Sequence, residues 1–266
     1  MRTFTTTTLI SIFLLVCLLG NAQEYGQKAN TVRVLTFNLL HGATTKGDFD
    51  LDKLAAVIKD ADADIVAMQE VDYKTTRAKG YDLATELGWR TKMAPIFGIA
   101  MPFNGGAYGD GILCKMPILE SKNLALPHSA NSEPRTALSV LIQLNSGDTI
   151  RFVATHLEHS KNSTDRIDQI NTINAEFAND RFPTILAGDL NDTPESKAIS
   201  TLKEYWKDSS AATSFLTFPS HAPNRKIDYI TYSPAKSWEV IESRAICDSI
   251  ASDHCAVLSV LRLTEN

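Results

Sequence analysis

The chain has 266 residues, of which 44% are hydrophobic and 8% aromatic, with 13 glycines and four cysteines. This composition excludes a disordered tail, a collagen-like repeat and a disulfide-dense miniprotein, because apolar content is ordinary and cysteine is sparse. Acidic residues outnumber basic ones, 31 to 26. Proteins that grip long nucleic acid usually carry a basic face that neutralises phosphates, so we expect no stable nucleic-acid complex.

Residues 1–22 have the pattern of a secretory signal peptide. Arg2 is followed by the apolar run Leu9–Leu19, and small residues at 20–22 precede a cleavage point before Gln23. The run is shorter than the roughly 20 residues that span a bilayer, so we expect no transmembrane anchor. The mature chain would be exported to a periplasmic or extracellular space, with 25 basic against 31 acidic residues.

Residues 23–266 show no repeat, low-complexity tract or Gly/Ser linker. We therefore expect a single domain, acting as a monomer. Cys114, Cys247 and Cys255 remain in this region, and an odd number of cysteines cannot all pair internally. We interpret them as small buried hydrophobic residues, with a Cys247–Cys255 bridge as the alternative.

Short β-type runs recur along the chain, and several alternate between apolar and polar residues. They cover Thr31–Asn38, Asp64–Gln69, Ala137–Leu144, Thr149–His156, Thr184–Gly188, Ile227–Tyr232, Trp238–Ile246 and Ala256–Leu263. Helical spacing follows Asp50, with Leu51, Leu54, Ala55 and Ile58 on one stripe, and follows Ser163 or Thr164, with Ile167, Ile170, Ile173 and Phe177 inward. A shorter helix is predicted over Asp82–Leu87.

Strands outnumber helices, and the helices do not alternate strictly with strands. This pattern favours an α/β fold, a four-layered α/β sandwich of two packed mixed β-sheets flanked by helices. A Rossmann-like sheet would need a glycine-rich turn after the first strand. The sequence there is FNLLHG, residues 37–42, which provides no such turn.

Polar side chains stand at the ends of several predicted strands. They are Asn38, Glu70, His156, Asp189, Asn191, Asp253 and His254. A polar group at the end of a buried strand is rigidly held and can still reach a cleft, as an active site requires. Asp189 and Asn191 are two residues apart, so in an extended backbone they would point the same way.

The acidic and amide members of this set offer oxygen ligands. Glu70, Asp189, Asn191 and Asp253 would therefore favour Mg²⁺, with Mn²⁺ or Ca²⁺ possible, over zinc. Magnesium commonly binds through one or two carboxylates, waters and a substrate phosphate. The set therefore predicts phosphoryl chemistry, in which water is activated and charge on phosphate oxygens is neutralised.

Six strings in order resemble the motifs of the endonuclease/exonuclease/phosphatase superfamily. They are VLTFNLLHG (34–42), DIVAMQEVD (64–72), FVATHLEH (152–159), ILAGDLND (185–192), KIDYI (226–230) and SDHCAV (252–257). The resemblance spans about residues 31–263 and implies the four-layered, DNase I-like fold. It also implies a metal-dependent hydrolase that acts on phosphoester bonds.

By this resemblance Glu70 would hold the divalent metal, with Asn38 next to it. Asp253 would be a ligand on the metal side or would hold the neighbouring groups.

The same resemblance implies catalytic roles for five residues. His156 would donate to a phosphate oxygen, while Asp189 and Asn191 would position the attacking water and stabilise charge. His254 would be oriented by Asp228. Whether His254 or Asp189 accepts the proton is left open.

Basic residues suggest the substrate side of the site. Arg135 precedes a predicted strand at a place where related proteins use arginine to touch phosphate. Arg225 and Lys226 lie just before Asp228 and would meet a second phosphate. Asp110 stands in a glycine-rich stretch where the family usually has Asn, which counts against a substrate-binding role.

The phosphoester substrate could be a lipid headgroup, a nucleic acid or a small metabolite, and a diester is not distinguished from a monoester. The apolar stretch Met93–Phe103 would serve a sphingomyelinase-like or glycosylphosphatidylinositol-lipid-related phosphodiesterase as an exposed loop, but a buried strand is the favoured interpretation. A secreted nuclease is a second alternative. A catalytically inactive protein that binds phosphate ligands is the alternative from a different class.

Overall fold

The computed structural model describes residues 30–161 and 164–264. The predicted signal peptide, residues 1–22, lies outside the described residues. Within the described ranges, no helix is both long enough and apolar enough to cross a bilayer.

The first of two mixed sheets has the strand order β11-β12-β1-β2-β4-β3 within the described residues. Its strands are β1 (Thr31–Asn38), β2 (Ile65–Tyr73), β3 (Ala94–Phe103), β4 (Gly106–Cys114), β11 (Trp238–Ile246) and β12 (Ala256–Leu263). Only β1 and β2 pair in parallel, and the helix α2 (Leu51–Asp60) connects them.

The second sheet has the order β5-β6-β7-β8-β10-β9. Its strands are β5 (Ile118–Leu126), β6 (Arg135–Gln143), β7 (Thr149–His156), β8 (Thr184–Asp189), β9 (Lys207–Asp208) and β10 (Asp228–Ser233). Here β7 and β8 pair in parallel and are connected by α4 (Thr164–Phe177). The two sheets are therefore built around similar strand–helix–strand units.

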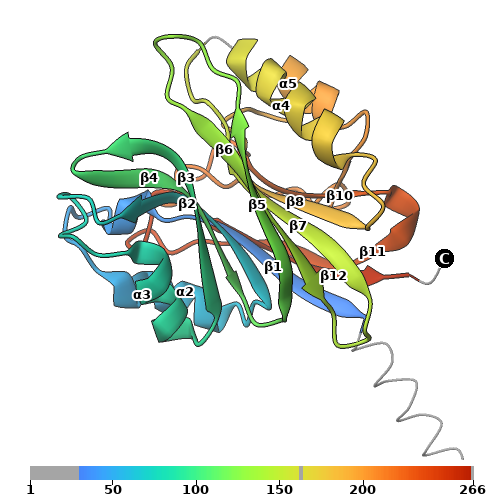
Figure 1. The fold of residues 1–266 in the computed structure, drawn as a ribbon, viewed down its shortest axis with the longest axis horizontal. Helices are drawn as coiled ribbons and strands as arrows, with labels where there is room; N and C mark the ends of the chain where they lie inside the picture. The colour runs from blue at the N-terminus through green and yellow to red at the C-terminus, as the bar shows by residue number, and fades with distance from the viewer. Residues whose placement is uncertain (1–29, 162–163, 265–266) are drawn as a thin grey trace, which may run out of the picture.

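The sheets pack face to face and helices cover their outer faces (Figure 1). Val34, Ile65, Phe152 and Ile185 belong to the core between the sheets and are fully buried. A second core joins the first sheet to α2 and α3 (Leu83–Thr91), and a third joins the second sheet to α4 and α5 (Lys197–Leu202). Short 3₁₀ turns cover Leu40–Gly42 and Ala235–Ser237. The predicted four-layered α/β sandwich is confirmed.

Sequence patterns located the strands whose faces alternate but missed others. The structure adds β4, β5, β9 and α5. Strand β4 reads GAYGDGILC, and its glycines suggest turns. In the structure Gly109 lies so close to the carbonyl of Gly98 on β3 that a side chain would not fit, so glycine here permits strand pairing. Strand β5 is an edge strand with mixed polar residues, which gives no clear period.

The apolar stretch Met93–Phe103 forms β3, so the prediction of a strand is confirmed but its burial is not. Strand β3 is at the edge of the first sheet, and within it only Gly98 is buried. Ile99 is 50% exposed. Ile96 and Phe97 are partly buried against the cores, so Ile99 is the large apolar side chain that β3 exposes most.

Cys247 and Cys255 form a disulfide, and Cys114 is free and buried. The interpretation of all three as small buried hydrophobic residues was therefore wrong for two of them. The bridge closes the loop that ends in Asp253 and His254, because Cys255 directly follows them.

Gly188 permits the close approach of β7 and β8 just before Asp189. A Cβ at this position would overlap the carbonyl oxygen of Thr155 on β7. We expect Gly188→Ala to lower the free energy of unfolding by about 2 kcal/mol or more, since neither backbone can move without breaking the ladder. Urea denaturation measures this loss.

The matched control is Gly147→Ala, in a turn with φ 94° and no atom within 4 Å of the new Cβ. Backbone strain alone should cost about 1 kcal/mol there. Equal losses in the two variants would contradict close strand approach as the reason for Gly188.

Candidate active site

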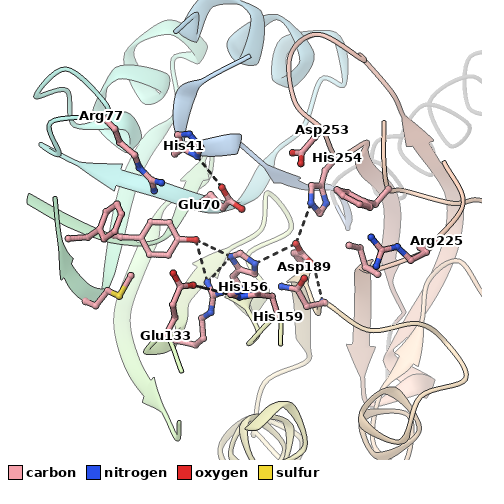
Figure 2. Close-up of a pocket in the computed structure, with 17 residues that line it drawn as sticks. His41, Glu70, Arg77, Glu133, His156, His159, Asp189, Arg225, Asp253 and His254 are labelled. Atoms are coloured by element: carbon pink, nitrogen blue, oxygen red, sulfur yellow. Dashed lines mark hydrogen bonds and ion pairs between the residues drawn. The ribbon is translucent and has the colours of Figure 1, made fainter. Parts of the chain in front are cut away.

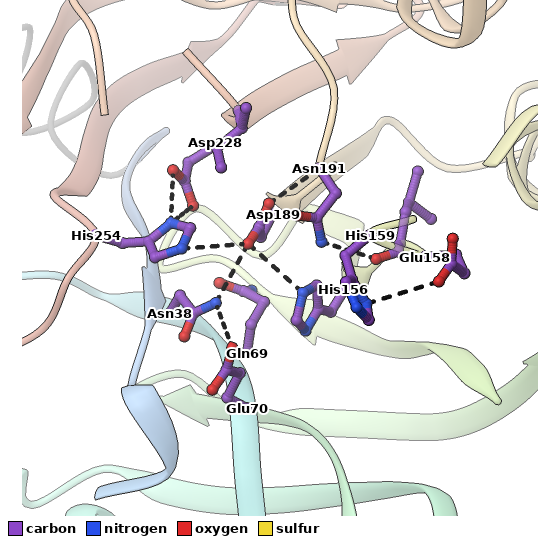
Figure 3. A network of polar contacts seen from close by, with 12 residues as sticks. Asn38, Gln69, Glu70, His156, Glu158, His159, Asp189, Asn191, Asp228 and His254 are labelled. Atoms are coloured by element: carbon purple, nitrogen blue, oxygen red, sulfur yellow. Dashed lines mark hydrogen bonds and ion pairs between the residues drawn. The ribbon is translucent and has the colours of Figure 1, made fainter. Parts of the chain in front are cut away.

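The candidate site lies where three strand ends of the second sheet meet. His156 ends β7, Asp189 ends β8 and Asp228 begins β10, and the strand register sets both His156 and Asp228 opposite Asp189. Asn38 ends β1 in the facing sheet. Figure 3 shows these side chains converging on Asp189. The parallel β7–β8 pair explains the convergence, because the carboxyl ends of parallel strands lie at one edge.

Glu70 reaches the site through a bulge. The sequence predicted that the strand stops at Gln69, but β2 continues to Tyr73 with a register shift between Met68 and Val71. Glu70 lies in this irregularity with φ 57°. A β-bulge reorients the side chain that it carries, and here it accompanies the turn of the Glu70 carboxylate into the pocket.

Two side chains hold the Glu70 carboxylate. Asn38 donates from Nδ2 to Oε1 over 3.3 Å, and Nδ1 of His41 lies 3.3 Å from Oε2. Burial would raise the pKa of Glu70, but these hydrogen bonds outweigh it and hold the pKa below its usual value. Glu70 is therefore ionised at neutral pH and faces the pocket as a carboxylate.

Asp189 is the centre of the polar network. Its Oδ2 accepts from Nδ2 of Asn38 at 3.2 Å and lies 3.5 Å from Nε2 of His156 and 3.7 Å from Nε2 of His254. The side chain is only 1% exposed. Burial, with the nearby charge of Asp228, raises the pKa of Asp189 to about 7. A carboxylate with this pKa can accept a proton near neutral pH.

His254 is paired with Asp228, as the resemblance implied. Nδ1 of His254 lies 3.1 Å from Oδ2 of Asp228. Burial would lower the pKa of His254, but the charges of Asp228 and Asp189 outweigh it and raise the pKa to about 10. His254 is thus a cation at neutral pH, with its ring packed at 4.7 Å against the ring of Phe218.

Asn191 is linked to Asp189 by a hydrogen bond from its backbone, and not by two side chains that point the same way from an extended strand, as the sequence suggested. The backbone at Asn191 has φ 52°, so the segment is a turn and not an extended strand. The backbone N–H of Asn191 donates to Oδ1 of Asp189 at 2.9 Å, and the side-chain Nδ2 of Asn191 donates to the backbone carbonyl of Leu157. Both residues still line the same pocket.

Arg135 contacts Nδ1 of His156, the ring nitrogen that does not face Asp189. Its Nη1 lies 3.1 Å from Nδ1 of His156 and donates to the hydroxyl of Tyr108 at 3.3 Å. Burial, reinforced by the positive charge of Arg135, lowers the pKa of His156 well below its usual value. His156 is therefore a neutral imidazole.

A cavity of about 400 Å³ collects these groups (Figure 2). Of the sequence-predicted residues, its wall includes Glu70, Arg135, His156, Asp189, Asn191, Arg225, Asp253 and His254. Asn38 and Asp228 hydrogen-bond to these lining residues without being part of the wall. The structure thus brings every predicted site residue to one place.

Sequence reasoning missed a substantial part of the wall. The additional lining residues are His41, Arg77, Met101, Phe103, Tyr108, Glu133, His159, Phe218 and Ile227. Three of them lie inside quoted motif strings, His41 in VLTFNLLHG, His159 in FVATHLEH and Ile227 in KIDYI, and their proximity in sequence to Asn38, His156 and Asp228 was the available signal. The β3 residues carried no signal beyond hydrophobicity.

Two residues with uncertain roles, Asp110 and Lys226, do not line this cavity. Asp110 is 2% exposed beneath the site, and burial raises its pKa to about 8, so at neutral pH it is mostly protonated and adds little charge. Lys226 hydrogen-bonds to Asp208 and Ser210 and lines a neighbouring cavity. The expectation that Lys226 meets a substrate phosphate is therefore not favoured, whereas Arg225 lines both cavities.

Two groups of ligands could hold a divalent metal. Asp189, Asp228 and His254 lie within 4.8 Å of one another, but Asp228 and His254 already hydrogen-bond to each other. Glu70 and Asp253 line the cavity with carboxylates, and Asn38 lies beside Glu70. These are oxygen donors of the kind that Mg²⁺ and Mn²⁺ prefer, so this second group fits the expected metal better.

A model of the Endonuclease/Exonuclease/phosphatase family matches residues 35–254. The chain belongs to this family. Members of the family are generally hydrolases that act on phosphoester bonds. The matched range includes every predicted site residue, from Asn38 to His254. A search of curated proteins finds no match.

Solved structures of the family share the fold at low sequence identity. A family protein from Bacteroides vulgatus is 23% identical, with a TM-score of 0.73 over 88% of this chain and 99% of that chain. The catalytic domain of human Nocturnin with bound sulfate is 18% identical, TM-score 0.71, covering 88% and 95%. A mannosyl-6-phosphatase from Bacteroides thetaiotaomicron is 16% identical, TM-score 0.68, covering 88% and 100%.

Asn38 donates to two carboxylates, so its replacement by a third carboxylate should be unfavourable. We expect Asn38→Asp to lower the free energy of unfolding by about 2 kcal/mol or more at pH 8 in chelator, because hydrogen bonds to Glu70 and Asp189 become repulsions. Urea denaturation measures the loss.

The control is Asn123→Asp at an exposed position, which removes one amide hydrogen bond to the carbonyl of Ile99. The free energy of unfolding of this variant should fall by about 1 kcal/mol. If Asn38→Asp were as stable as wild type in chelator, Asn38 would not be the group that separates the two carboxylates.

Proposed function

We propose that the mature chain is an exported, divalent-metal-dependent phosphoesterase that hydrolyses a phosphodiester, or a phosphomonoester, by attack of water. The observation that supports this most is the position of Asp189. Its carboxylate lies between the neutral imidazole of His156 and the cationic imidazole of His254, in the cavity that Glu70 also lines. Such a cavity offers a base, hydrogen-bond donors and metal ligands to one phosphate.

The metal ligands in this proposal are Glu70 and Asp253, with Asn38 beside them. When bound, Mg²⁺ or a similar ion would withdraw charge from the phosphate oxygens and so favour attack by water. Glu70 suits this role because its low pKa keeps it ionised. The Nδ2 hydrogen bonds of Asn38 fix Glu70 relative to Asp189.

Asp189 is the proposed general base. Water would attack phosphorus as a proton passes to the Asp189 carboxylate. The ester P–O bond would break on the opposite side of the phosphorus, and the leaving oxygen would keep the electron pair and take a proton from solvent. His254 cannot accept this proton, because its pairing with Asp228 keeps it protonated. We therefore propose that His254 stabilises negative charge and that Asp189 accepts the proton.

His156 and Asn191 are the proposed neutral partners. His156, uncharged, would donate a hydrogen bond to a phosphate oxygen, and Asn191 holds Asp189 and borders the position of the water. Fixed donors of this kind stabilise charge that develops in the transition state without needing to reorganise.

Arg225 is the proposed contact for the rest of the substrate. Its guanidinium lies 4.8 Å from the centre of the Phe218 ring, and in the described part of the chain it has no carboxylate partner. An arginine of this kind can bind a further anionic group. Arg135 belongs to the same wall, but its Nη atoms already contact protein groups.

A diester with an apolar substituent, such as a phospholipid or a glycosylphosphatidylinositol lipid, is a second candidate substrate. It is favoured by Met101 and Phe103 of the edge strand β3, which line the cavity and lie near the exposed Ile99. Such side chains would contact an acyl chain or a membrane surface.

Export is proposed from two independent observations. The signal-peptide pattern of residues 1–22 predicts it, and the Cys247–Cys255 disulfide is typical of an oxidising compartment. The protein would act there as a monomer.

Hydrolysis of bis-p-nitrophenyl phosphate beside p-nitrophenyl phosphate tests the reaction class. We expect the mature protein to cleave the diester with Mg²⁺ or Mn²⁺ and to lose activity in excess chelator. The reason is that the ion held by Glu70 and Asp253 would neutralise charge on the phosphate. Release of nitrophenolate is the measurement. Chelator-insensitive cleavage would contradict metal dependence, and no cleavage of either compound would favour the phosphate-binding protein without catalysis.

Single substitutions test the assigned roles. We expect Glu70→Ala and His254→Ala each to lower kcat/KM by about 10²-fold or more, because one removes a metal ligand and the other a charge beside Asp189. Lys236→Ala, in the 3₁₀ turn between β10 and β11, is the control and should retain full activity. Near-normal turnover in either site variant would remove that residue from the mechanism.

A further inference from the structure

Arg135 contacts two imidazoles of the cavity at once. Its Nη1 lies 3.1 Å from Nδ1 of His156, and its Nη2 lies 3.3 Å from Nδ1 of His159. Figure 2 labels the two imidazoles, His156 and His159, and Glu133 in the wall of the same pocket. Nη2 also pairs with Oε2 of Glu133 at 2.8 Å.

These contacts dictate which nitrogen of each ring carries the proton. A guanidinium has N–H donors only and stays charged in proteins, so the nitrogen that it contacts must offer a lone pair. A neutral imidazole then carries its proton on the other nitrogen. Both His156 and His159 are therefore fixed as Nε2–H tautomers.

We infer that Arg135 is a positioning residue that fixes both histidines as Nε2–H donors, and that His159 is a second hydrogen-bond donor to the substrate phosphate. This assignment rests on the proposed phosphoesterase function. In this assignment Arg135 acts on the two histidines and does not itself contact the phosphate, whereas the sequence predicted that contact.

The burial of Arg135 supports a positioning role. The side chain is 3% exposed, which leaves little of the guanidinium for a ligand. Its Nε is buried and has no hydrogen-bond partner among the described residues. A buried charged group with an unpaired N–H is unfavourable for stability, so the arrangement is better explained by what it does to the neighbouring rings.

His159 has the exposure that a ligand contact needs. Its side chain is 61% exposed and lines the cavity. Nδ1 of His159 lies 3.3 Å from Nη2 of Arg135, whereas the carboxylate oxygens of Glu158 and Glu133 lie 3.6 and 3.9 Å from it, beyond hydrogen-bond distance. The Nε2–H is thus left for a ligand. A phosphate bound between Glu70 and the two histidines would lie near the metal-binding carboxylates on one side and two N–H donors on the other.

His254 provides an internal contrast in the same cavity. Its Nδ1 contacts the carboxylate of Asp228, which is an acceptor, so this Nδ1 must carry a proton. The geometry therefore requires a bare Nδ1 on His156 and His159 and a protonated Nδ1 on His254. This pattern is specific to the contacts described here.

Nitrogen-15 NMR of the histidine rings tests the tautomers without any turnover. The chain has six histidines, and His156→Asn, His159→Asn and His254→Asn assign the three signals. At pH 7.5 in chelator we expect an unprotonated Nδ1 and a protonated Nε2 for His156 and His159, and a protonated Nδ1 for His254. A protonated Nδ1 on either of the first two would overturn the assignment.

Arg135→Met tests the positioning effect. It should release His156 and His159 to a mixture of tautomers and lower kcat by about 10²-fold, because two fixed donors are lost. The matched control is Arg151→Met, on the same strand as His156 but at its start, where the arginine pairs with Asp180. The control should leave both tautomers and kcat unchanged. Unchanged tautomers in folded Arg135→Met would overturn the role of Arg135.

A pair of substitutions tests His159 and does not depend on the folding of Arg135→Met. His159→Asn keeps an N–H donor and should retain most activity, whereas His159→Phe removes it and should lower kcat about tenfold with little change in KM. Equal activity of His159→Phe and wild type would overturn the second donor.

Inorganic phosphate separates a failure of this inference from a failure of the proposed function. In the wild-type protein with Mg²⁺, added phosphate should shift the Nε2–H proton signals of both His156 and His159. If these shifts appear but no phosphoester is cleaved, the proposed catalytic function fails while the donor pair stands. If esters are cleaved but the His159 signal does not respond to phosphate, the donor role of His159 fails.

Discussion

The site depends on the burial of one carboxylate, Asp189, at the end of β8. A buried carboxylate is costly unless hydrogen bonds and charges compensate it. Here the compensation comes from both sheets, with Asn38 from β1, His156 from β7 and His254 from the loop before β12. Packing of the two sheets is therefore a condition for the site, because neither sheet alone supplies all of these partners.

The same constraint orders the electrostatics of the cavity. Asp228 holds His254 as a cation on one side of Asp189, while burial, reinforced by the charge of Arg135, lowers the pKa of His156 and keeps it neutral on the other. The carboxylate between them is left as the group that can exchange a proton near neutral pH. Two histidines of one cavity thus have opposite charge states because the groups behind them differ, one a carboxylate and the other a guanidinium.

Much of the fold and of the site follows from the sequence. Alternating strands, the α2 and α4 stripes and the polar strand ends could be predicted because each reflects a local period or a motif. The position of Glu70 in a bulge and the left-handed turn at Asn191 could not, since both depend on how a strand is paired and ended. Strand β4 was missed because its glycines serve close strand approach, which no local pattern reveals.

The excess of acidic residues does not conflict with a site for an anionic substrate, because the charges are sorted within the cavity. Glu70 and Asp253 line the cavity together with Arg77, Arg135 and Arg225, and a bound metal ion would offset the two carboxylates. Arg77 is itself held by a bidentate pair with the buried Asp72. Local placement of charge, and not the net charge of the chain, therefore sets what the cavity can bind.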